Sequence, residues 1–316
     1  MTSRRFQPIC QCARGRTVAL FAGLAVAACL APAAAPAASA SPPKVVPAKQ
    51  NPAEVRAYWT PGRMLEAVPV AGPAAGLAAE VRPENGAEPG KPLAIEPTAA
   101  DSSIDDPERL DSAEQVPDNT SYPTRTHGKV FFTIPNQGDF VCSGTVVRSR
   151  SKQLAWTAGH CVYDDISGRF ATNWTFVPGY QDGERPFGEW PARQLATTGP
   201  WKRSGNLSYD VGAAKLAKRN GKPIQKVVGA RGIAFNQPRE QGFRAFGYPA
   251  EPNPLTLQLF TGQRLYACDS PRTDDDDPPG SGPDTLEINC DMTGGSSGGG
   301  WVIDGRFVNS VVSYGY

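Results

Sequence analysis

The sequence is poor in histidine, in excess charge and in long apolar runs, and each shortage excludes a class of protein. Its two histidines, His127 and His160, lie far apart and outside any His-Glu-x-x-His pattern, so the ligand set of a zinc peptidase is missing. A net charge of +1 provides no basic excess that would attract nucleic acid or a membrane surface. The strongly apolar run near the N-terminus is shorter than the roughly 20 residues that span a bilayer. We therefore expect no bound metal, no nucleic acid partner and no membrane span.

The first 40 residues have the features of a secretory signal peptide. A basic start, MTSRRFQPICQCARGR, leads into the apolar and then small-residue run TVALFAGLAVAACLAPAAAPAASA. Cleavage at the Ala-x-Ala site of residues 38–40 would leave Ser41 as the new terminus. The sequence VAAC, which ends at Cys29, loosely resembles a lipoprotein cleavage site and gives the alternative of a lipid anchor. We expect a secreted, extracellular protein that has no membrane attachment after signal cleavage.

Four of the seven cysteines lie beyond this leader, and an even number in an exported chain favours disulfides. They are Cys142, Cys161, Cys268 and Cys290. Four cysteines allow three pairings, and closure between near neighbours in the sequence favours Cys142 with Cys161 and Cys268 with Cys290. Free buried thiols are the alternative.

Residues 41–118 are rich in Ala, Pro, Gly and Glu and poor in aromatic residues. Such a composition provides too little apolar surface to offset the entropy that is lost when a backbone is ordered. We interpret them as a pro-segment or linker that is mostly disordered. The stretch NPAEVRAYWTPGRMLEAVPV, residues 51–70, is more apolar, and Thr60 followed by Pro61 favours the start of a helix. It is either a short helix that docks on the following domain as a pro-peptide or a sticky patch in a disordered tail.

From residue 119 onward, short apolar runs alternate with turn residues. Runs such as KVFFTI, FVCSGTVV, QLAWTA, FRAFGY and FVNSVVSYGY are rich in β-branched and aromatic side chains and predict strands. Their spacing, without long helical segments, favours an antiparallel sandwich or barrel over a parallel α/β sheet. Only QLAWTAGHCVYD and VGAAKLAKRN indicate helical turns.

An acidic stretch, TDDDDPPGSGPD at residues 273–284, lies between the last two cysteines. Its four adjacent carboxylates are the type of ligand that calcium prefers, but the ligand spacing of an EF-hand is absent. We expect a solvated loop, with calcium binding as the alternative.

Two adjacent serines, Ser296 and Ser297, stand between glycines in the sequence CDMTGGSSGGGWV. A Gly/Ser run taken alone is typical of a flexible linker. This run is embedded between strand-like segments, where glycines mark turns or the close approach of two backbones. One of the serines is therefore a candidate nucleophile.

A serine nucleophile requires a general base, which must be His127 or His160. His160 lies in AWTAGHCV, next to Cys161, a setting that fixes a ring in space. Asp210, in SYDVGAAKL, leads into an apolar run, where an acid is costly unless it has a partner. We predict that Asp210 orients His160 and stabilises its charged form.

The motifs TAGHC, YDVGAAKL and GGSSGG, in the order His, Asp, Ser, resemble those of the trypsin/chymotrypsin superfamily of serine endopeptidases, from about residue 128 to the end. GYP at residues 247–249 and D-x-x-G-G-x-S-G at 291–298 are more similar to its bacterial glutamyl-endopeptidase branch. The resemblance implies an all-β protease domain over residues 119–316. Its two antiparallel β-barrels would carry the histidine and aspartate on the first barrel and the nucleophile on the second.

The resemblance also implies a role for each residue of the site. The family pattern makes Ser297 the nucleophile rather than Ser296, and the amides of Gly295 and Ser297 the oxyanion hole. The Cys142–Cys161 pair matches the disulfide that ties the histidine loop to the preceding strand. The strand that pairs with an extended substrate is matched by Ser313, Tyr314 and Gly315. We expect a monomeric endopeptidase that acts on protein or peptide substrates through an acyl-enzyme, with no cofactor.

Two kinds of departure from the family pattern affect activation and specificity, and a third, at the end of the chain, affects closure of the fold. Ser296 replaces the aspartate by which trypsin receives its new N-terminal amine, so a zymogen must be activated through other contacts. Asp291 lies where trypsin keeps the acid that selects Arg or Lys, which motivates a basic preference as a hypothesis. The histidine that selects glutamate would fall near Val312, so that route is unsupported.

The chain stops at Tyr316, before the last strand and helix of the relatives. We expect the second barrel to be truncated at its C-terminal end, with an exposed sheet edge and low activity. An inactive or truncated protease-like binding module is the alternative function.

Overall fold

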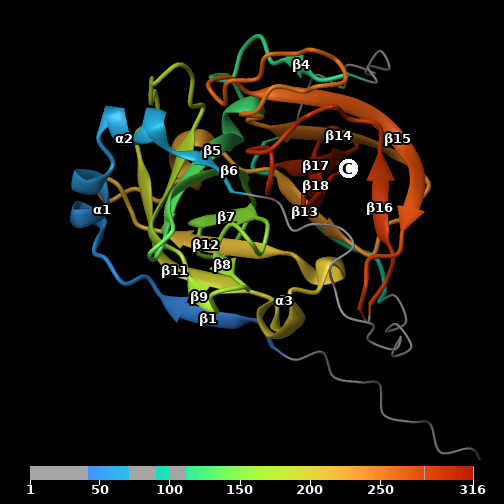
Figure 1. The fold of residues 1–316 in the computed structure, drawn as a ribbon, viewed down its shortest axis with the longest axis horizontal. Coiled ribbons are helices and arrows are strands. Elements are labelled where there is room, and N and C mark those ends of the chain that lie inside the picture. Colours follow the sequence, from blue (N-terminus) through green and yellow to red (C-terminus); the bar gives the residue numbers. More distant parts are fainter. Residues whose placement is uncertain (1–41, 71–89, 100–111, 281, 316) are drawn as a thin grey trace, which may run out of the picture. The chain divides into compact units, whose positions relative to one another are not determined.

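The computed structural model describes residues 42–70, 90–99, 112–280 and 282–315. The chain divides into two units, Met1–Ala37 and Ala38–Tyr316. The first unit, with most of the predicted signal peptide, lies outside the described residues, so the description concerns the second unit. Strands dominate it (Figure 1). Among the residues described, no helix is long and apolar enough to cross a membrane.

Six strands close the first barrel in the order β11, β10, β5, β6, β7, β12, because β12 pairs back onto β11. All six pairings are antiparallel. Large apolar side chains from these strands fill its core, among them Val130, Phe132, Phe176, Trp190 and Leu195. The strands are β5 (His127–Ile134), β6 (Gly138–Val146), β7 (Leu154–Thr157), β10 (Thr172–Pro178), β11 (Trp190–Thr197) and β12 (Gly212–Leu216).

The second half of the chain forms an eight-stranded sheet in the order β16, β15, β14, β17, β18, β13, β3, with β4 added beside β15. All its pairings are antiparallel except β13 with β18. The predicted all-β fold class is thus confirmed, as a closed barrel followed by a second sheet. The strands of this half are β13 (Gly232–Phe235), β14 (Gly242–Gly247), β15 (Tyr266–Asp276), β16 (Thr285–Ile288), β17 (Gly300–Ile303) and β18 (Phe307–Val311).

Short elements connect the strands of the two halves. They are the helices α3 (Gly199–Ser204) and α4 (Gln225–Val228), the 3₁₀ turns η1 (Thr124–Thr126) and η2 (Leu207–Tyr209), and the two-residue strands β8 (Tyr163–Asp164) and β9 (Arg169–Phe170). The helical turn expected within VGAAKLAKRN is absent, because residues 212–216 form β12 between β7 and β11. Pairing on both sides outweighs the weak helical pattern of this Ala-rich run.

The acidic stretch is a paired strand for part of its length rather than a loop. β15 runs on through residues 273–276 and pairs with β16, with Asp276 opposite Thr285. Arg239 and Arg272 both contact the Asp275 carboxylate, at 2.6 and 3.2 Å. These cations reduce the repulsion between adjacent carboxylates, so the run can pair as a strand instead of forming the expected solvated loop.

The segment before the first barrel contributes strands to both sheets. Its strands are β1 (Lys44–Pro47), β2 (Val68–Pro69), β3 (Leu93–Ile95) and β4 (Glu114–Gln115). β1 pairs with β11, β2 with β6, β3 with β13 and β4 with β15. Where the structure describes residues 41–118, it differs from the expected disorder, because pairing with existing strands orders short segments that lack a core of their own. Residues 71–89 and 100–111 lie outside the described residues.

Two short helices, α1 (Pro52–Tyr58) and α2 (Pro61–Glu66), lie against the outside of the first barrel (Figure 1). The side chains of Asn51 and Thr60 cap their first turns. The expected helix start at Thr60 is present, and a second helix precedes it. Of the two interpretations of residues 51–70, the docked form is the one that the structure adopts.

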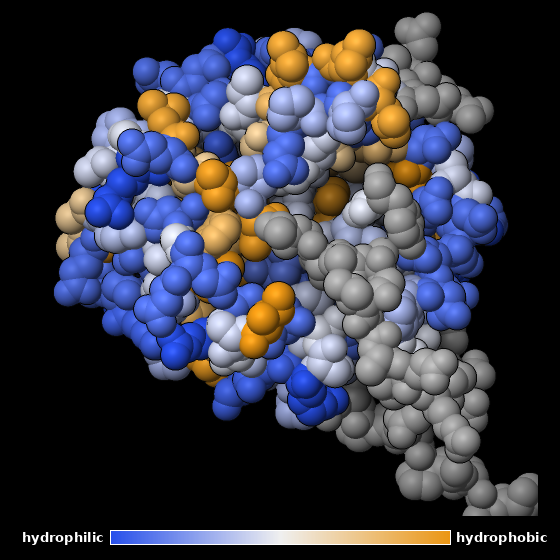
Figure 2. All heavy atoms as spheres, in the orientation of Figure 1, coloured by the Kyte–Doolittle hydropathy of each residue, from blue (hydrophilic) through white to orange (hydrophobic). Residues whose placement is uncertain are grey.

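Three apolar side chains fix these helices to the barrel. They are Val55, Trp59 and Met64, which are all at most 2 % exposed. The Trp59 indole nitrogen donates a hydrogen bond to the backbone oxygen of Asn173 on β10, at 2.5 Å. Exposed apolar residues are otherwise scattered over the face shown in Figure 2, which is largely hydrophilic.

Both predicted disulfides are confirmed. Cys142 bonds to Cys161 and Cys268 to Cys290. The first joins β6 to the turn after β7, and the second joins β15 to the segment after β16. Each closes a short loop next to a strand, as proximity in the sequence predicted.

A lysine is buried at the start of the first barrel. Lys129 on β5 is 2 % exposed, and its Nζ donates to the backbone oxygen of Gly262 at 2.8 Å. Nζ also lies 5.1 and 5.0 Å from the ring centroids of Phe131 and Tyr180. Burial lowers the pKa of this amine to about 7, because the charged form loses its hydration.

We expect Lys129 to make folding more favourable as the pH rises from 7 to 10. An unfolded lysine keeps its proton up to a pKa of about 10.4, whereas folded Lys129 loses it above about 7. The unfolded chain therefore binds more protons in this window, and the free energy of unfolding rises with pH by on the order of 1–3 kcal/mol. Denaturant unfolding at pH 6.5 and 9.5 should show this rise in wild type but not in Lys129→Met. Lys222→Met, at an exposed lysine, is the control; equal pH profiles for all three proteins would contradict the prediction.

Candidate active site

His160 lies in a tight turn after β7. The turn is closed by bonds from the amides of Val162 and Tyr163 to the Gly159 oxygen, and the Cys142–Cys161 disulfide fixes it to β6. A Cβ at Gly159 would lie 2.7 Å from Asp210 Oδ1, so this position requires glycine. The local sequence AGHC therefore sets the imidazole in one place.

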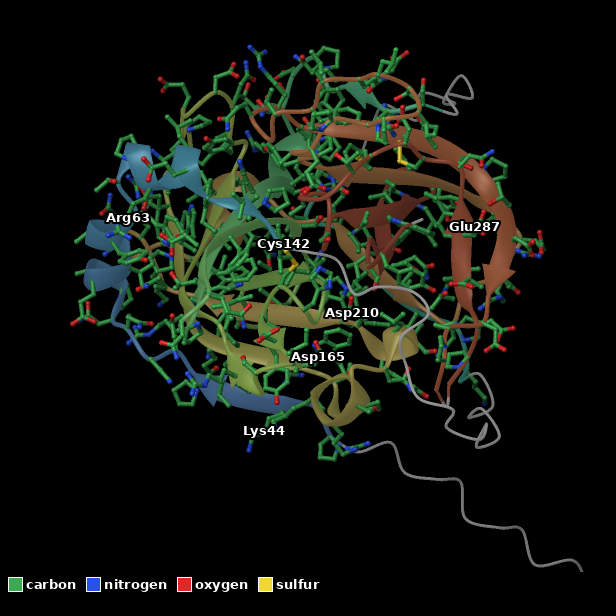
Figure 3. All side chains as sticks on the ribbon, viewed as in Figure 1. Lys44, Arg63, Cys142, Asp165, Asp210 and Glu287 are labelled. Atoms are coloured by element: carbon green, nitrogen blue, oxygen red, sulfur yellow. A yellow bond between two sulfur atoms is a disulfide. The ribbon has the colours of Figure 1, made fainter. Side chains whose placement is uncertain are left out.

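Asp210 holds the ring of His160 on one side. Its Oδ2 accepts from His160 Nδ1 at 2.7 Å, and its Oδ1 accepts from the His160 backbone amide at 2.8 Å. Ser313 Oγ also donates to Oδ2, at 2.5 Å. Three donors compensate a carboxylate that is 2 % exposed. The arrangement leaves His160 Nε2 as the ring atom that can exchange a proton with a nucleophile (Figure 3 labels Asp210 and Cys142).

The other histidine has a structural environment. His127 is fully buried, stacks on Phe246 with ring centroids 3.9 Å apart, and has Nδ1 3.0 Å from Thr145 Oγ1. Its Nε2 accepts from Arg231 at 3.4 Å. Burial, and then the positive charges of Arg231 and Arg244, hold its pKa well below the usual value. A neutral ring with both nitrogens occupied is a core residue and not a general base.

Ser297 lies beside the histidine turn. Its backbone oxygen accepts from the Ser143 amide at 2.7 Å and is 3.7 Å from Cys161 Sγ. Within the described part of the chain, its hydroxyl has no hydrogen-bond partner, and His160 Nε2 is buried and unpartnered. The structure thus joins His160 to Asp210 and brings Ser297 next to them without a Ser297–His160 hydrogen bond. Such bonds are often long in unliganded sites and shorten when substrate binds.

Ser296 differs from its neighbour. Its hydroxyl donates to the backbone oxygen of Thr293 at 2.6 Å, within its own turn, and the residue is 3 % exposed. Its Cβ packs against Gly247, where an added Cβ would come within 2.5 Å. Ser296 therefore has a packing role, and the open hydroxyl belongs to Ser297.

The backbone at Gly295 suits an anion site. Gly295 has φ +96°, and a Cβ there would meet the Tyr248 oxygen at 2.6 Å, so only glycine fits. The amides of Gly295 and Ser297 have no acceptor among the described residues. Unpaired, preorganised amides next to a nucleophile are what an oxyanion hole requires.

The three residues expected to pair with the substrate, Ser313, Tyr314 and Gly315, have different surroundings in the protein. Ser313 contacts the Asp210 carboxylate. Tyr314 donates from its hydroxyl to Asp276 Oδ2 and accepts from Thr285 Oγ1, which links the segment after β18 to the acidic β15–β16 pair. Gly315 is exposed and close to the end of the described chain. The structure therefore brings Ser313 into the His160–Asp210 cluster and ties Tyr314 to the β15–β16 pair.

Asp291 contacts the N-terminal segment. Its Oδ1 accepts from the backbone amide of Ala113 at 2.6 Å, and Oδ2 is buried without a partner among the described residues. Nothing in the sequence signals this contact, because the two residues are far apart along the chain. Sequence reasoning likewise missed Ser143, whose hydroxyl donates to the Gly295 oxygen at 2.8 Å. One polar residue in the strand run FVCSGTVV gives no hint of such a role.

The described residues contain one group of possible metal ligands, formed by Cys142, His160 and Cys161 within 4.8 Å of one another. The two sulfurs are joined in a disulfide, so neither is a thiolate able to bind a metal. This group does not fit a metal ion.

Sequence and structure comparisons identify relatives among proteases. No family model matches the chain. The glutamyl endopeptidase of Bacillus licheniformis is 31% identical over 168 residues, 52% of this chain and 49% of that protein. A Bacillus subtilis protein named extracellular metalloprotease is 28% identical over 144 residues, 45% of this chain and 44% of that protein. The chain thus spans about half the length of the curated relatives it matches.

Two solved structures match over most of their length. The thermostable serine protease AL20 from an extremophilic microorganism is 43% identical with a TM-score of 0.54, over 61% of this chain and 86% of that one. The protease Anisep from Arthrobacter nicotinovorans is 35% identical with a TM-score of 0.53, over 65% of this chain and 88% of that one. The chain therefore belongs to the trypsin-like serine proteases, in the branch that includes the glutamyl endopeptidases.

Proposed function

We propose that the chain is a secreted serine endopeptidase whose catalytic residues are Ser297, His160 and Asp210. The observation that carries the proposal is the buried contact of 2.7 Å between His160 Nδ1 and Asp210 Oδ2. Nε2 has no partner among the residues that the structure describes and lies next to the segment that carries Ser297. A buried imidazole that is oriented by a carboxylate and has one free nitrogen is the base that a serine nucleophile needs.

The reaction proceeds in two halves. Ser297 Oγ attacks the peptide carbonyl carbon as His160 Nε2 takes its proton, and Asp210 stabilises the imidazolium that forms. The amides of Gly295 and Ser297 stabilise the negative oxygen, and collapse expels the amine, which receives the proton from His160. Water then attacks the acyl-enzyme, gives its proton to His160, and the second collapse releases the acid and restores Ser297.

Secretion is proposed from the leader sequence of residues 1–40. The two disulfides support secretion, because disulfides persist in oxidising compartments. The Bacillus subtilis relative, which is named as an extracellular protein, supports it as well. We propose that the secreted protein acts as a monomer on protein or peptide substrates.

Ser297→Ala should abolish labelling by a fluorophosphonate and lower kcat by roughly 10⁶-fold, as loss of the nucleophile does in comparable triads. Ser296→Ala should keep its labelling, because the Ser296 hydroxyl is bonded to Thr293. Labelling is followed by mass spectrometry of the modified peptide. Modification at Ser296 would reject the assignment. Absence of labelling both in wild type and in a variant whose N-terminal segment is loosened would favour the second candidate, an inactive binding module, which is motivated by the lack of a Ser297–His160 hydrogen bond among the described residues.

The N-terminal segment is proposed to keep the enzyme latent. Residues 67–70 run beside β6, where the Val70 amide donates to the Val141 oxygen at 3.4 Å. Pro69 lies close to Gly294, where an added Cβ would be 3.2 Å from the Pro69 Cβ. Gly294 directly precedes the proposed oxyanion amide of Gly295. A segment in this position obstructs part of the groove that a peptide must occupy to reach Ser297.

Weakening the anchor of this segment should raise the activity of the full chain. Trp59→Ala removes a buried indole and its bond to Asn173, a change that costs about 3–5 kcal/mol in a packed core. We expect fluorophosphonate to label Ser297 at least about tenfold faster in this variant. Leu65→Ala, at a residue of α2 that is 60% exposed, is the control and should label at the wild-type rate. Equal rates for all three proteins would exclude a latent state held by this segment.

Asp291 is proposed to favour Arg or Lys before the scissile bond, because its buried Oδ2 has no partner in the described part of the protein. In Asp291→Asn, kcat/KM for peptides with Arg at that position should fall at least about tenfold, with little change for Leu. Asparagine keeps an acceptor for the Ala113 amide, so the fold should survive. A peptide library reads this preference directly. If the variant's profile equals that of wild type, Asp291 does not select the substrate and serves only to bind the Ala113 amide. A preference of the wild type for Glu would contradict the prediction and match the activity in the name of the Bacillus licheniformis relative.

A further inference from the structure

The oxyanion loop, residues 293–297, needs a support that the family resemblance does not supply. Trypsin holds this loop with an aspartate at the position of Ser296, whereas the Ser296 hydroxyl here donates to the Thr293 oxygen of its own turn. A loop with glycine at positions 294 and 295 has little intrinsic preference for one conformation. Other contacts must therefore fix the direction of the Gly295 amide.

Ser143 on β6 makes three hydrogen bonds around this loop, two of them to the loop itself. Its Oγ donates to the Gly295 oxygen at 2.8 Å and accepts from the Tyr248 amide at 2.9 Å. Its backbone amide donates to the Ser297 oxygen at 2.7 Å. Ser143 is 1 % exposed, so each of these bonds is shielded from water. A residue of the first barrel thus holds both ends of the proposed oxyanion hole.

A second chain of contacts reaches the same loop from Lys129. Lys129 Nζ donates to the Gly262 oxygen, and the Gly262 amide donates to the Pro249 oxygen at 2.7 Å. The Ala250 amide then donates to the Gly294 oxygen at 2.7 Å. Lys129 and Ser143 stand opposite each other in the β5–β6 register. The two supports therefore start from one point of the first barrel.

Because the peptide unit is planar, a hydrogen bond to its oxygen also sets the direction of its N–H. The C=O of Gly294 and the N–H of Gly295 belong to one trans peptide and point opposite ways. When the Ala250 amide holds the Gly294 oxygen, the Gly295 N–H is turned to the other side. Ser143 holds the next peptide, which carries the Ser296 N–H, through the Gly295 oxygen, so the peptides on both sides of the Gly295 Cα are fixed. A flip of either peptide would break a buried hydrogen bond and leave a polar group unpaired.

We propose that Ser143 is a positioning residue that preorganises the oxyanion hole in place of the aspartate found in trypsin, with Lys129 supporting the Tyr248–Ala250 segment behind it. The inference rests on the proposed function. It implies that the hole is built whether or not the N-terminal segment has been removed, so that latency comes from obstruction of the groove.

The test compares Ser143→Ala with Ser143→Thr in the full chain, using kcat, KM and the rate of fluorophosphonate labelling. Loss of the hydroxyl should lower kcat and the labelling rate by about 10- to 100-fold while KM changes by less than about threefold, because the hole acts on the transition state. Threonine keeps the hydroxyl and should restore kcat to within about threefold of wild type. Lys129→Met, which leaves Ser143 in place, should lower kcat in the same direction.

Ser270→Ala is the matched control, because Ser270 is 4 % exposed and its hydroxyl likewise donates one bond, to Pro271, and accepts one, from Asn289. It should lower the melting temperature without lowering kcat. A wild-type kcat in Ser143→Ala, or a fall in kcat for Ser270→Ala equal to that for Ser143→Ala, would overturn the positioning role. Labelling of wild type with no loss in Ser143→Ala rejects this inference alone, whereas absence of labelling in both wild type and Trp59→Ala, in which the N-terminal segment is loosened, rejects the proposed function as well.

Discussion

A buried carboxylate beside a buried imidazole is the interaction on which the site depends. Asp210 and His160 are both almost excluded from water, and each would be costly to bury alone. Their contact at 2.7 Å, with further donors from the His160 amide and Ser313, offsets that cost. The same bonds fix the ring so that one nitrogen remains for chemistry.

Barrel closure explains why this pair can be held so firmly. Asp210 lies just before β12, separated from it by Val211; β12 is the strand that closes the first barrel against β7 and β11, and His160 follows β7. The disulfide at Cys161 adds a covalent link to β6. The second sheet then contributes Ser313 and the loop of Ser297, and Ser143 of the first barrel clamps that loop. The proposed active site is thus a junction at which each half holds a part of the other.

Local sequence predicted what depends on neighbours along the chain. The strand runs, the two disulfides and the helix start at Thr60 followed from patterns within a few residues or from short loop closures. Local sequence did not predict the strands formed by VGAAKLAKRN and by residues 273–276, because both conformations depend on pairing with strands that are not adjacent in the local pattern. The docked form of residues 51–70 could not be chosen from sequence either, because the surface that buries Trp59 belongs to β10 and its neighbours.

The sequence by itself determined the order of the three candidate catalytic residues, His160, Asp210 and Ser297, because each stands in a short motif whose residue types suit the proposed chemistry. Only the tertiary structure decided that Asp291 meets Ala113, that Ser143 supports Gly295, and that residues 67–70 lie next to Gly294. These contacts join segments separated by many residues, through backbone groups that every residue type carries. Hydrogen bonds of that kind leave no mark in composition or spacing, and only the register of the folded strands establishes them.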